Sequence, residues 1–294
     1  MKKYVVSDIP RRDFLKMSLK GGLVFAASPA ILSSLTSCGS ESVSEATGMS
    51  IDPAILKKVI GKALEKGGDF ADVYLENRVS RQIVMEESKF KNGLYGVSQG
   101  AGVRVISGNK TGYAYSDEIT EEKLLRAAEV ASYVARNGSA VTPVDINKAE
   151  RKSYITVEQP LAEIADSRRI EIIQRANDAA MSYNPLIKMA SVDYYDEIRS
   201  RVIANSEGIY LQDENPLMFF IVQTMSDNGK ARHMSRERLS KHSGFEMFDK
   251  FSPEEVAEKA AREAVAMLDA EAAPAGIMDV VMMNGWGGVL VHEA

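Results

Sequence analysis

The stretch from residue 71 to residue 116 constrains the fold more than any other part of this chain. It consists of short runs rich in β-branched and aromatic residues, at 72–76, 82–85 and 103–106, and glycines lie between the second and third runs and after the third. Runs of this length and composition, bounded by turn residues, are typical of β-strands. We therefore predict antiparallel strands throughout this stretch.

Helical patterns lie on both sides of these predicted strands. Asp52 and Pro53 combine a side-chain cap with a proline at the first helical position, and an apolar face follows them. A second helix is predicted to start at Thr120, with acidic residues in its first turn, and to extend to about Arg136. Residues 51–136 are thus predicted to form an amino-terminal α+β domain in which helices cover a mainly antiparallel sheet.

A second structured region is predicted after a linker. Residues 137–152 mix Gly, Pro, Ser and Asp without periodicity, which is typical of a linker. Residues 153–275 are predicted to form a central α+β domain, a mixed α/β region that leads to the end of the chain. Its predicted elements are a helix over 161–183, strands from 187 to 225 with breaks at 205–208 and 213–216, and a helix from Ser252 to about Leu268.

The first 37 residues have the layout of an export signal. Arg11 and Arg12 form a twin-arginine pair, and a mildly apolar stretch over 19–35 follows them. That stretch is too short and too rich in Gly, Ser and Pro for a membrane span, which needs about 20 apolar residues. We therefore predict a twin-arginine signal peptide over 1–37 that takes no part in the fold.

Cys38 is the only cysteine, and it ends a Leu-Thr-Ser-Cys sequence that resembles the bacterial lipobox. In such a sequence the signal peptidase cuts before the cysteine, which then carries lipid, and residues 38–50 would be a tether. The alternative is a solvated thiol in a flexible leader. The predicted location is periplasmic or membrane-anchored, as a lipoprotein. A single cysteine also excludes an intramolecular disulfide and a zinc site made of several thiolates.

The charge balance argues against nucleic acid as a partner. The formal net charge is -5 at pH 7, with 36 Lys and Arg against 41 Asp and Glu. A molecule of this charge has no general attraction for a phosphate backbone. It also lacks the basic stripe with interleaved aromatic residues that nucleic-acid-binding surfaces carry, so direct action on DNA is not expected.

The end of the chain carries the residues with the clearest chemical meaning. A continuous apolar run at 278–283 predicts a buried strand, the glycine-rich segment 284–288 predicts a turn, and a helix is predicted to start after it. His292 and Glu293 lie in this predicted helix. In zinc hydrolases an imidazole binds the metal and a neighbouring carboxylate takes a proton from the metal-bound water. Alone, however, this pair is weak evidence, and it favours an ordinary surface or core histidine over a metal ligand.

The residues around this pair resemble a known family. The sequence Gly-Trp-Gly-Gly-Val-Leu-Val-His-Glu-Ala at 285–294 is similar to the segment that introduces HExxxH in the TldD/PmbA family, also called modulators of DNA gyrase. The resemblance continues upstream at 68–74, 99–108 and 110–116, and it extends from about residue 51 to the last residue. The chain resembles the TldD side of the family, because the PmbA (TldE) side lacks the metal motif.

This resemblance implies a zinc-dependent endopeptidase that acts on unstructured peptides in a two-subunit assembly, as a homodimer or with a TldE/PmbA-like paralogue. His292 matches the first zinc ligand and Glu293 the catalytic base, so residues 276–294 would begin an incomplete catalytic domain. The second histidine and a cysteine ligand of the family have no counterpart up to Ala294. One His and one Glu cannot make a closed zinc site, so the chain alone is expected to be inactive.

Other features have less specific interpretations. The alternative function is an exported noncatalytic binding or assembly subunit of a protease complex, which would bind no zinc. His233 and His242 lie in a polar stretch that favours a solvated loop over a metal or anion site. The glycine segments at 100–102 and 108–112 predict tight turns rather than phosphate-binding loops. Trp286 would either shape a substrate cleft or pack against the predicted strand.

Overall fold

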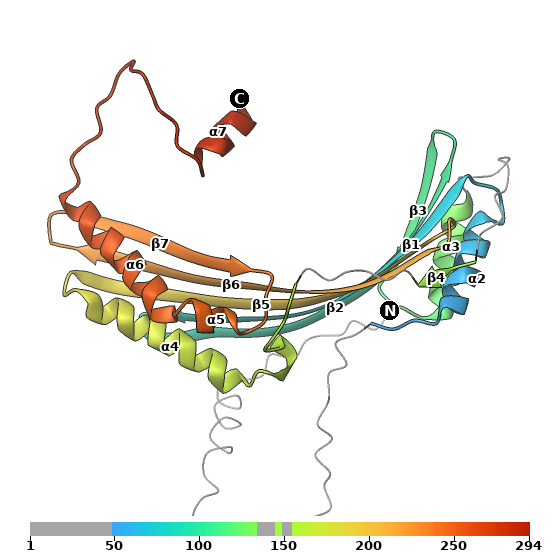
Figure 1. The fold of residues 1–294 in the computed structure, drawn as a ribbon, viewed down its shortest axis with the longest axis horizontal. Coiled ribbons are helices and arrows are strands. Elements are labelled where there is room, and N and C mark those ends of the chain that lie inside the picture. The colour runs from blue at the N-terminus through green and yellow to red at the C-terminus, as the bar shows by residue number, and fades with distance from the viewer. Residues whose placement is uncertain (1–48, 134–144, 149–154) are drawn as a thin grey trace, which may run out of the picture. The chain divides into compact units, whose positions relative to one another are not determined.

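The computed structural model describes residues 49–133, 145–148 and 155–294. The predicted signal peptide with Arg11 and Arg12, the lipobox cysteine Cys38 and most of the predicted linker lie outside these residues, so those predictions stay predictions. Figure 1 shows that the described chain is organised around one long, curved sheet with helices near its two ends.

The sheet has seven strands, in the order β3-β2-β1-β5-β6-β4, and β7 also pairs with β6. The pairs are antiparallel except for the short parallel pair of β4 and β6. This confirms the predicted α+β class with a mainly antiparallel sheet. The strands are β1 (Phe70–Glu86), β2 (Lys89–Ser107), β3 (Lys110–Ser116), β4 (Asn147–Lys148), β5 (Ile187–Asn205), β6 (Ile209–Asp227) and β7 (Arg232–Lys241).

Three of the helices begin with the side-chain caps that the sequence predicts. Asp52 Oδ1 accepts from the backbone N–H of Ala54 at 2.8 Å, and the Thr120 and Ser252 side chains cap two later helices in the same way. Such caps satisfy N–H groups that have no partner inside the helix. The helices are α2 (Pro53–Leu64), α3 (Glu121–Ser132), η2 (Leu161–Glu163), α4 (Asp166–Tyr183), α5 (Met247–Lys250), α6 (Pro253–Ala266), η3 (Met267–Asp269) and α7 (Gly287–Glu293).

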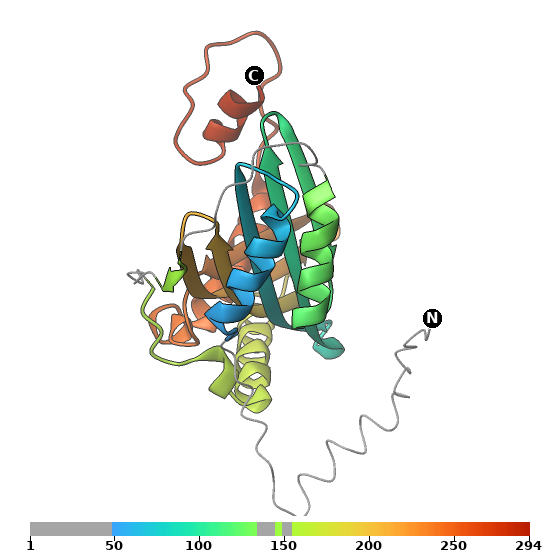
Figure 2. The same cartoon turned by 90° about the vertical axis from the view of Figure 1, so that its right-hand side faces the viewer.

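Two hydrophobic cores lie on the same face of the sheet. At one end α2 and α3 cover a core that includes Leu75 and Val202, and at the other end α4 and α6 cover a core that includes Val192 and Tyr194. Alternate residues of a strand point to the same face, and Val192, Tyr194 and Val202 are separated by even numbers of residues. Figure 2 shows α2 and α3 side by side against the sheet.

The sheet runs without interruption through both regions that were predicted as separate domains. β1 pairs with β5 from Asp72 opposite Asn205 to Glu86 opposite Ser191. The predicted linker contributes β4, which adds to the edge of β6. The domain boundaries themselves stay a prediction.

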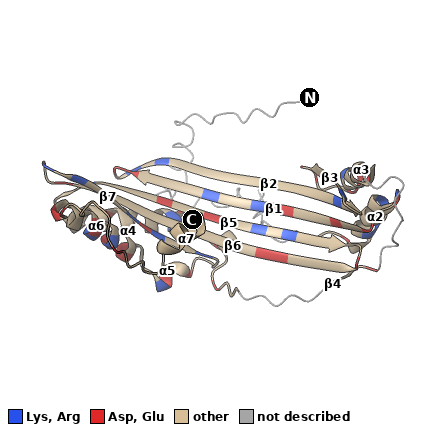
Figure 3. Cartoon of the chain, turned by 90° about the horizontal axis from the view of Figure 1, so that it is seen from above, with Lys and Arg blue, Asp and Glu red and all other residues tan. Residues whose placement is uncertain are grey.

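The opposite face of the sheet carries a band of paired charges. Arg199 Nη2 donates to Glu197 Oε1 at 2.7 Å, and Arg201 forms an ion pair across to Asp213 on β6. Figure 3, which looks onto the sheet, shows acidic and basic residues along its middle strands. Because these charges compensate one another across neighbouring strands, the band adds little net charge to this face.

Two sequence predictions in this region are wrong. The predicted break at 213–216 is absent, since β6 continues through Pro216. A proline is tolerated in a strand where its missing N–H faces an open edge. Here Pro216 pairs with Ile198 on one side, and β7 starts to pair with β6 only at Met218 on the other. The predicted solvated loop around His233 is the strand β7.

None of the helices in the described ranges is both long enough and apolar enough to cross a membrane.

Candidate functional site

The segment with His292 and Glu293 forms a turn and a helix, as predicted, but not a strand. Gly285 has φ +96°, a conformation that favours glycine, and α7 follows it and includes both residues. The apolar run at 278–283 forms no strand, and Val281 is 89% exposed. A strand needs a neighbour to take its backbone hydrogen bonds, and no described strand pairs with this run.

The residues of this segment do not fit a complete zinc site. His292 and Glu293 are both exposed, and neighbouring positions of a helix diverge by about 100° around its axis. A zinc site in a hydrolase has three protein ligands and one open position. Among the residues that the structure describes, no group of three or more His, Cys, Asp or Glu side chains is placed to hold a metal ion. α7 therefore presents one imidazole and one carboxylate to a metal ion. The assignment of His292 as a zinc ligand and Glu293 as the catalytic base stays a prediction.

The other two histidines lie outside this segment, on β7 and directly after it. His233 is on β7, where its carbonyl oxygen accepts from Ser226 Oγ at 3.4 Å. His242 follows β7, and its Nδ1 lies 2.9 Å from the carbonyl oxygen of Pro216. Because a carbonyl oxygen only accepts, Nδ1 carries the hydrogen, and Nε2 is the basic nitrogen of the neutral ring.

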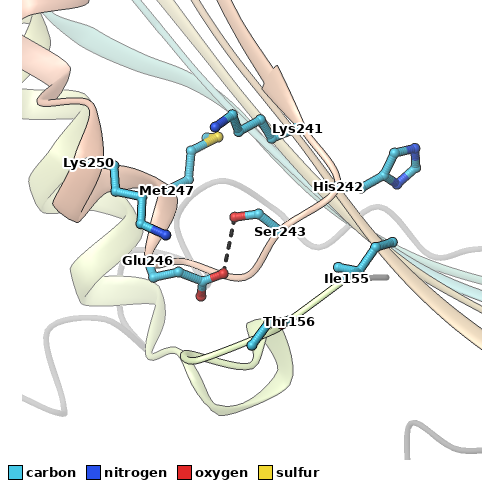
Figure 4. Close-up of a pocket in the computed structure, with 8 residues that line it drawn as sticks. All are labelled: Ile155, Thr156, Lys241, His242, Ser243, Glu246, Met247 and Lys250. Carbon is cyan, nitrogen blue, oxygen red and sulfur yellow. Dashed lines mark hydrogen bonds between the residues drawn. The ribbon is translucent and has the colours of Figure 1, made fainter. Parts of the chain in front are cut away.

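A cavity of about 310 Å³ lies beside His242, where the end of β7 meets α5. Figure 4 shows that the lining residues come from three places in the chain, the end of β7 with the turn after it, α5, and the segment that precedes η2, and that the ring of His242 points away from the other side chains. The cavity has two lysines, one buried carboxylate and an apolar part to which Met247 contributes. Its lining residues are Ile155, Thr156, Lys241, His242, Ser243, Glu246, Met247 and Lys250.

Hydrogen bonds to Glu246 hold the wall of this cavity in place. Glu246 is only 4% exposed, and its Oε2 accepts from the backbone N–H of Gln159 at 2.9 Å. Its Oε1 accepts from Gly244 N at 2.8 Å and from Ser243 Oγ at 3.2 Å. Burial acts to raise the pKa of Glu246, but the hydrogen bonds from Gln159, Gly244 and Ser243 outweigh it and lower that pKa. Glu246 is therefore an ionised carboxylate with both oxygens occupied.

Comparison with known proteins assigns the fold to a class of metallopeptidases. The sequence model described as PmbA/TldA metallopeptidase domain 1 matches residues 71–135, and the one described as PmbA/TldA metallopeptidase central domain matches residues 159–268. These two ranges contain most of the sheet and of the helices that cover it. The chain belongs to the TldD/PmbA family, which confirms the resemblance seen in the sequence.

Individual relatives match the same part of the chain. A metalloprotease TldD homolog of Haemophilus influenzae is 31% identical over 238 residues, which is 77% of this chain and 48% of that protein. A zinc metalloprotease TldD homolog of Saccharolobus solfataricus is 25% identical over 159 residues, 51% of this chain and 32% of that protein. The chain thus spans about half the length, or less, of these relatives.

Solved structures support the fold. A putative modulator of DNA gyrase from Thermotoga maritima superimposes with a TM-score of 0.62 at 14% identity, over 76% of this chain and 50% of that one. TldE from Thermococcus kodakarensis gives a TM-score of 0.58 at 14% identity, over 72% and 47%. At this level of identity the similarity concerns the fold alone.

The sequence did not reveal the cavity beside α5. Its lining combines residues 155 and 156 with residues 241–250, which are more than 80 positions further along the chain. The short helix α5 was not predicted, because four residues are too few for a helical period to be recognised. The available signal was the Ser243-Gly244 dipeptide, which predicts a turn but no ligand.

Proposed function

We propose that this chain is part of a zinc-dependent endopeptidase that acts on unstructured peptides, with His292 as one metal ligand and Glu293 as the catalytic base. The observation that carries the proposal is the glycine turn followed by α7, which presents both exposed residues on one helix in a member of the TldD/PmbA family. The names of the relatives, metalloprotease and zinc metalloprotease, support it. The remaining ligands are not among the described residues, so we expect the chain alone neither to retain zinc nor to cleave peptides.

The outer edge of β2 is where we expect an extended peptide to lie. β2 pairs with β3 only from Ala101 to Ser107, so the outer edge from Lys89 to Gly100 has no neighbouring strand in the described part of the chain. An open edge offers backbone N–H and C=O groups to an added strand, and such pairing is largely independent of the peptide's sequence. Leu94 and Val97 on this edge are both more than half exposed and would contact the peptide's side chains.

Zinc content and peptide cleavage, measured together, test the proposal. The reading frame is determined past the codon for Ala294, and the complete product is purified and compared with the His292→Ala and Glu293→Gln variants. His233→Ala is the matched control, because His233 lies on β7 outside α7. We expect about one zinc per chain. His292→Ala should lose zinc, Glu293→Gln should keep zinc but cleave unfolded casein about 10²- to 10⁴-fold more slowly, and His233→Ala should change neither.

The alternative, a noncatalytic binding or assembly subunit, predicts a different result. The open edge of β2, which offers backbone groups to a strand of a partner chain as well as to a peptide, is the observation that favours it. In that case the complete product would bind no zinc, and His292→Ala would have no effect on any cleavage seen with a partner. Stable association with a TldE-like chain, tested by co-expression and co-purification, would be expected under either proposal and so does not separate them.

A further inference from the structure

The cavity beside α5 combines positive charge with an apolar floor. Lys241 is the last residue of β7 and Lys250 is the last residue of α5. Neither lysine forms an ion pair within the described part of the chain. Lys241 Nζ lies 4.4 Å from the centroid of the Phe251 ring, a cation–π contact that orients the ammonium group without neutralising it. Met247 is 1% exposed and, with Ile155, gives the cavity its apolar surface.

The one carboxylate among the residues that line the cavity, Glu246, forms no ion pair with either lysine. Both oxygens of Glu246 already accept hydrogen bonds from the loop and from Gln159. The hydroxyl of Thr156, by contrast, has no hydrogen bond within the described residues. The cavity therefore offers an incoming ligand two ammonium groups and one hydroxyl, all of which suit an oxyanion.

The wall of the cavity around Gly244 is held in place by tight packing against the segment that precedes η2. A Cβ added at Gly244 would overlap the carbonyl oxygen of Gln159 and the carboxylate of Glu246, so the loop after β7 fits directly against the segment that precedes η2. The backbone N–H of Phe245 also donates to Gln159 O at 2.9 Å. A cavity with walls fixed in this way is preformed, as most small-molecule sites are.

We propose that this cavity binds a small organic carboxylate with an apolar body, about the size of one acylated amino acid. The volume of about 310 Å³ is at the lower limit of ligand pockets. A phosphate is less suited, because phosphate sites use arrays of backbone N–H groups, and here Glu246 takes the N–H of Gly244. The site does not rest on the proposed peptidase function, since neither zinc nor His292 takes part in it.

The experiment is an NMR titration of the purified chain labelled with ¹³C at its methionine methyl groups. The Met247 signal is identified by its loss in Met247→Leu. Three probes are added: N-acetylleucine, its uncharged amide N-acetylleucinamide, and inorganic phosphate. We expect the Met247 signal to shift and saturate with N-acetylleucine, with a dissociation constant on the order of 1 mM. The amide and phosphate should each bind at least tenfold more weakly.

Variants distinguish the two lysines from general surface charge. Lys241→Gln combined with Lys250→Gln should weaken N-acetylleucine at least tenfold. Lys230→Gln is the matched control, because Lys230 is exposed, has no ion pair within the described residues and lies in the turn between β6 and β7. Thermal unfolding of each variant verifies the fold. Equal binding of the amide, equal binding of phosphate, or no shift of the Met247 signal would each overturn the proposal.

Discussion

Arg169 and Asp196 form a fully buried ion pair between α4 and β5. Arg169 Nε donates to Asp196 Oδ2 at 2.8 Å, and both side chains are 0% exposed. The same guanidinium also donates to the carbonyl oxygens of Leu161 and Ile164 and thereby fastens η2 to the start of α4. Burial acts to lower the pKa of Arg169, but Asp196 and Tyr194 outweigh it and raise that pKa, so the guanidinium is charged.

Removing one partner of this pair should strongly destabilise the protein. Asp196→Asn leaves the buried Arg169 guanidinium with only the exposed carboxylate of Asp166, 3.1 Å away, and we expect a loss of about 3–5 kcal/mol in the free energy of unfolding. Urea denaturation measures it. Arg175→Gln is the matched control, because the Arg175–Glu254 pair has a similar distance of 2.6 Å but is 46% and 34% exposed. It should cost less than about 1 kcal/mol. Equal losses in both variants would contradict the role of burial.

Gly244 should be far less tolerant of a side chain than Gly61. Gly244→Ala places a Cβ against the carbonyl oxygen of Gln159, a backbone atom that cannot move aside alone. We expect a loss of about 1–3 kcal/mol in the free energy of unfolding. Gly61 in α2 has nothing within 4 Å of an added Cβ, so Gly61→Ala should be neutral or stabilise by about 0.5–1 kcal/mol. Denaturant unfolding measures the free energy of unfolding of both variants, and equal values would contradict the prediction.

Glu246 should stabilise the protein at neutral pH and lose this contribution at acidic pH. Its pKa is lowered in the folded protein, so its contribution to stability is present above its unfolded pKa of about 4.3 and is lost as the pH falls through its folded pKa. Glu246→Gln should therefore cost about 1–3 kcal/mol at pH 7. The difference from the unmodified protein should shrink at about pH 3.5. The exposed Glu258→Gln serves as control, and a difference that is constant with pH would contradict the assignment.

The predicted export signal and lipid anchor can be tested in living cells. Replacing Arg11 and Arg12 with lysines should block export and leave the precursor in the cytoplasm, because the twin-arginine pair is the feature that is recognised. Cys38→Ser should permit export but abolish incorporation of radiolabelled palmitate. Cell fractionation and lipid labelling measure the two outcomes separately. Labelling that persists in Cys38→Ser would show that Cys38 carries no lipid.

The class of the fold could be predicted from the sequence, but the length of its strands could not. Residues 72–76 and 82–85 were predicted as separate runs, and both lie in the single strand β1. Gly100 and Gly102 were predicted to lie in a tight turn, and this is wrong, since both lie within β2 opposite Glu76 and Tyr74. A continuous partner strand supplies their backbone hydrogen bonds, and this long-range pairing outweighs the local preference of glycine.

The local part of the candidate site was predictable, and the assembled part was not. Gly285 marked a turn and the residues after it a helix, and both form because they need only neighbours in the sequence. The run at 278–283 required a partner strand, which a local pattern does not supply. The Arg169–Asp196 pair and the cavity wall at Glu246 depend on residues 27 and 87 positions apart. Such contacts have no local sequence signature.

The open edge of β2 should be sensitive to added charge if an extended peptide lies there. Natural sheets block their edges with lysine, because a charged side chain hinders the approach of another strand. Leu94→Lys combined with Val97→Lys should therefore weaken the binding of an unfolded peptide to the complete protein by roughly tenfold, about 1.4 kcal/mol. Val130→Lys introduces a single lysine at an exposed apolar residue of α3 and should have no effect. Fluorescence anisotropy with a labelled casein peptide provides the measurement. Unchanged binding by the edge variant would place the peptide elsewhere, without affecting the assignment of His292 and Glu293.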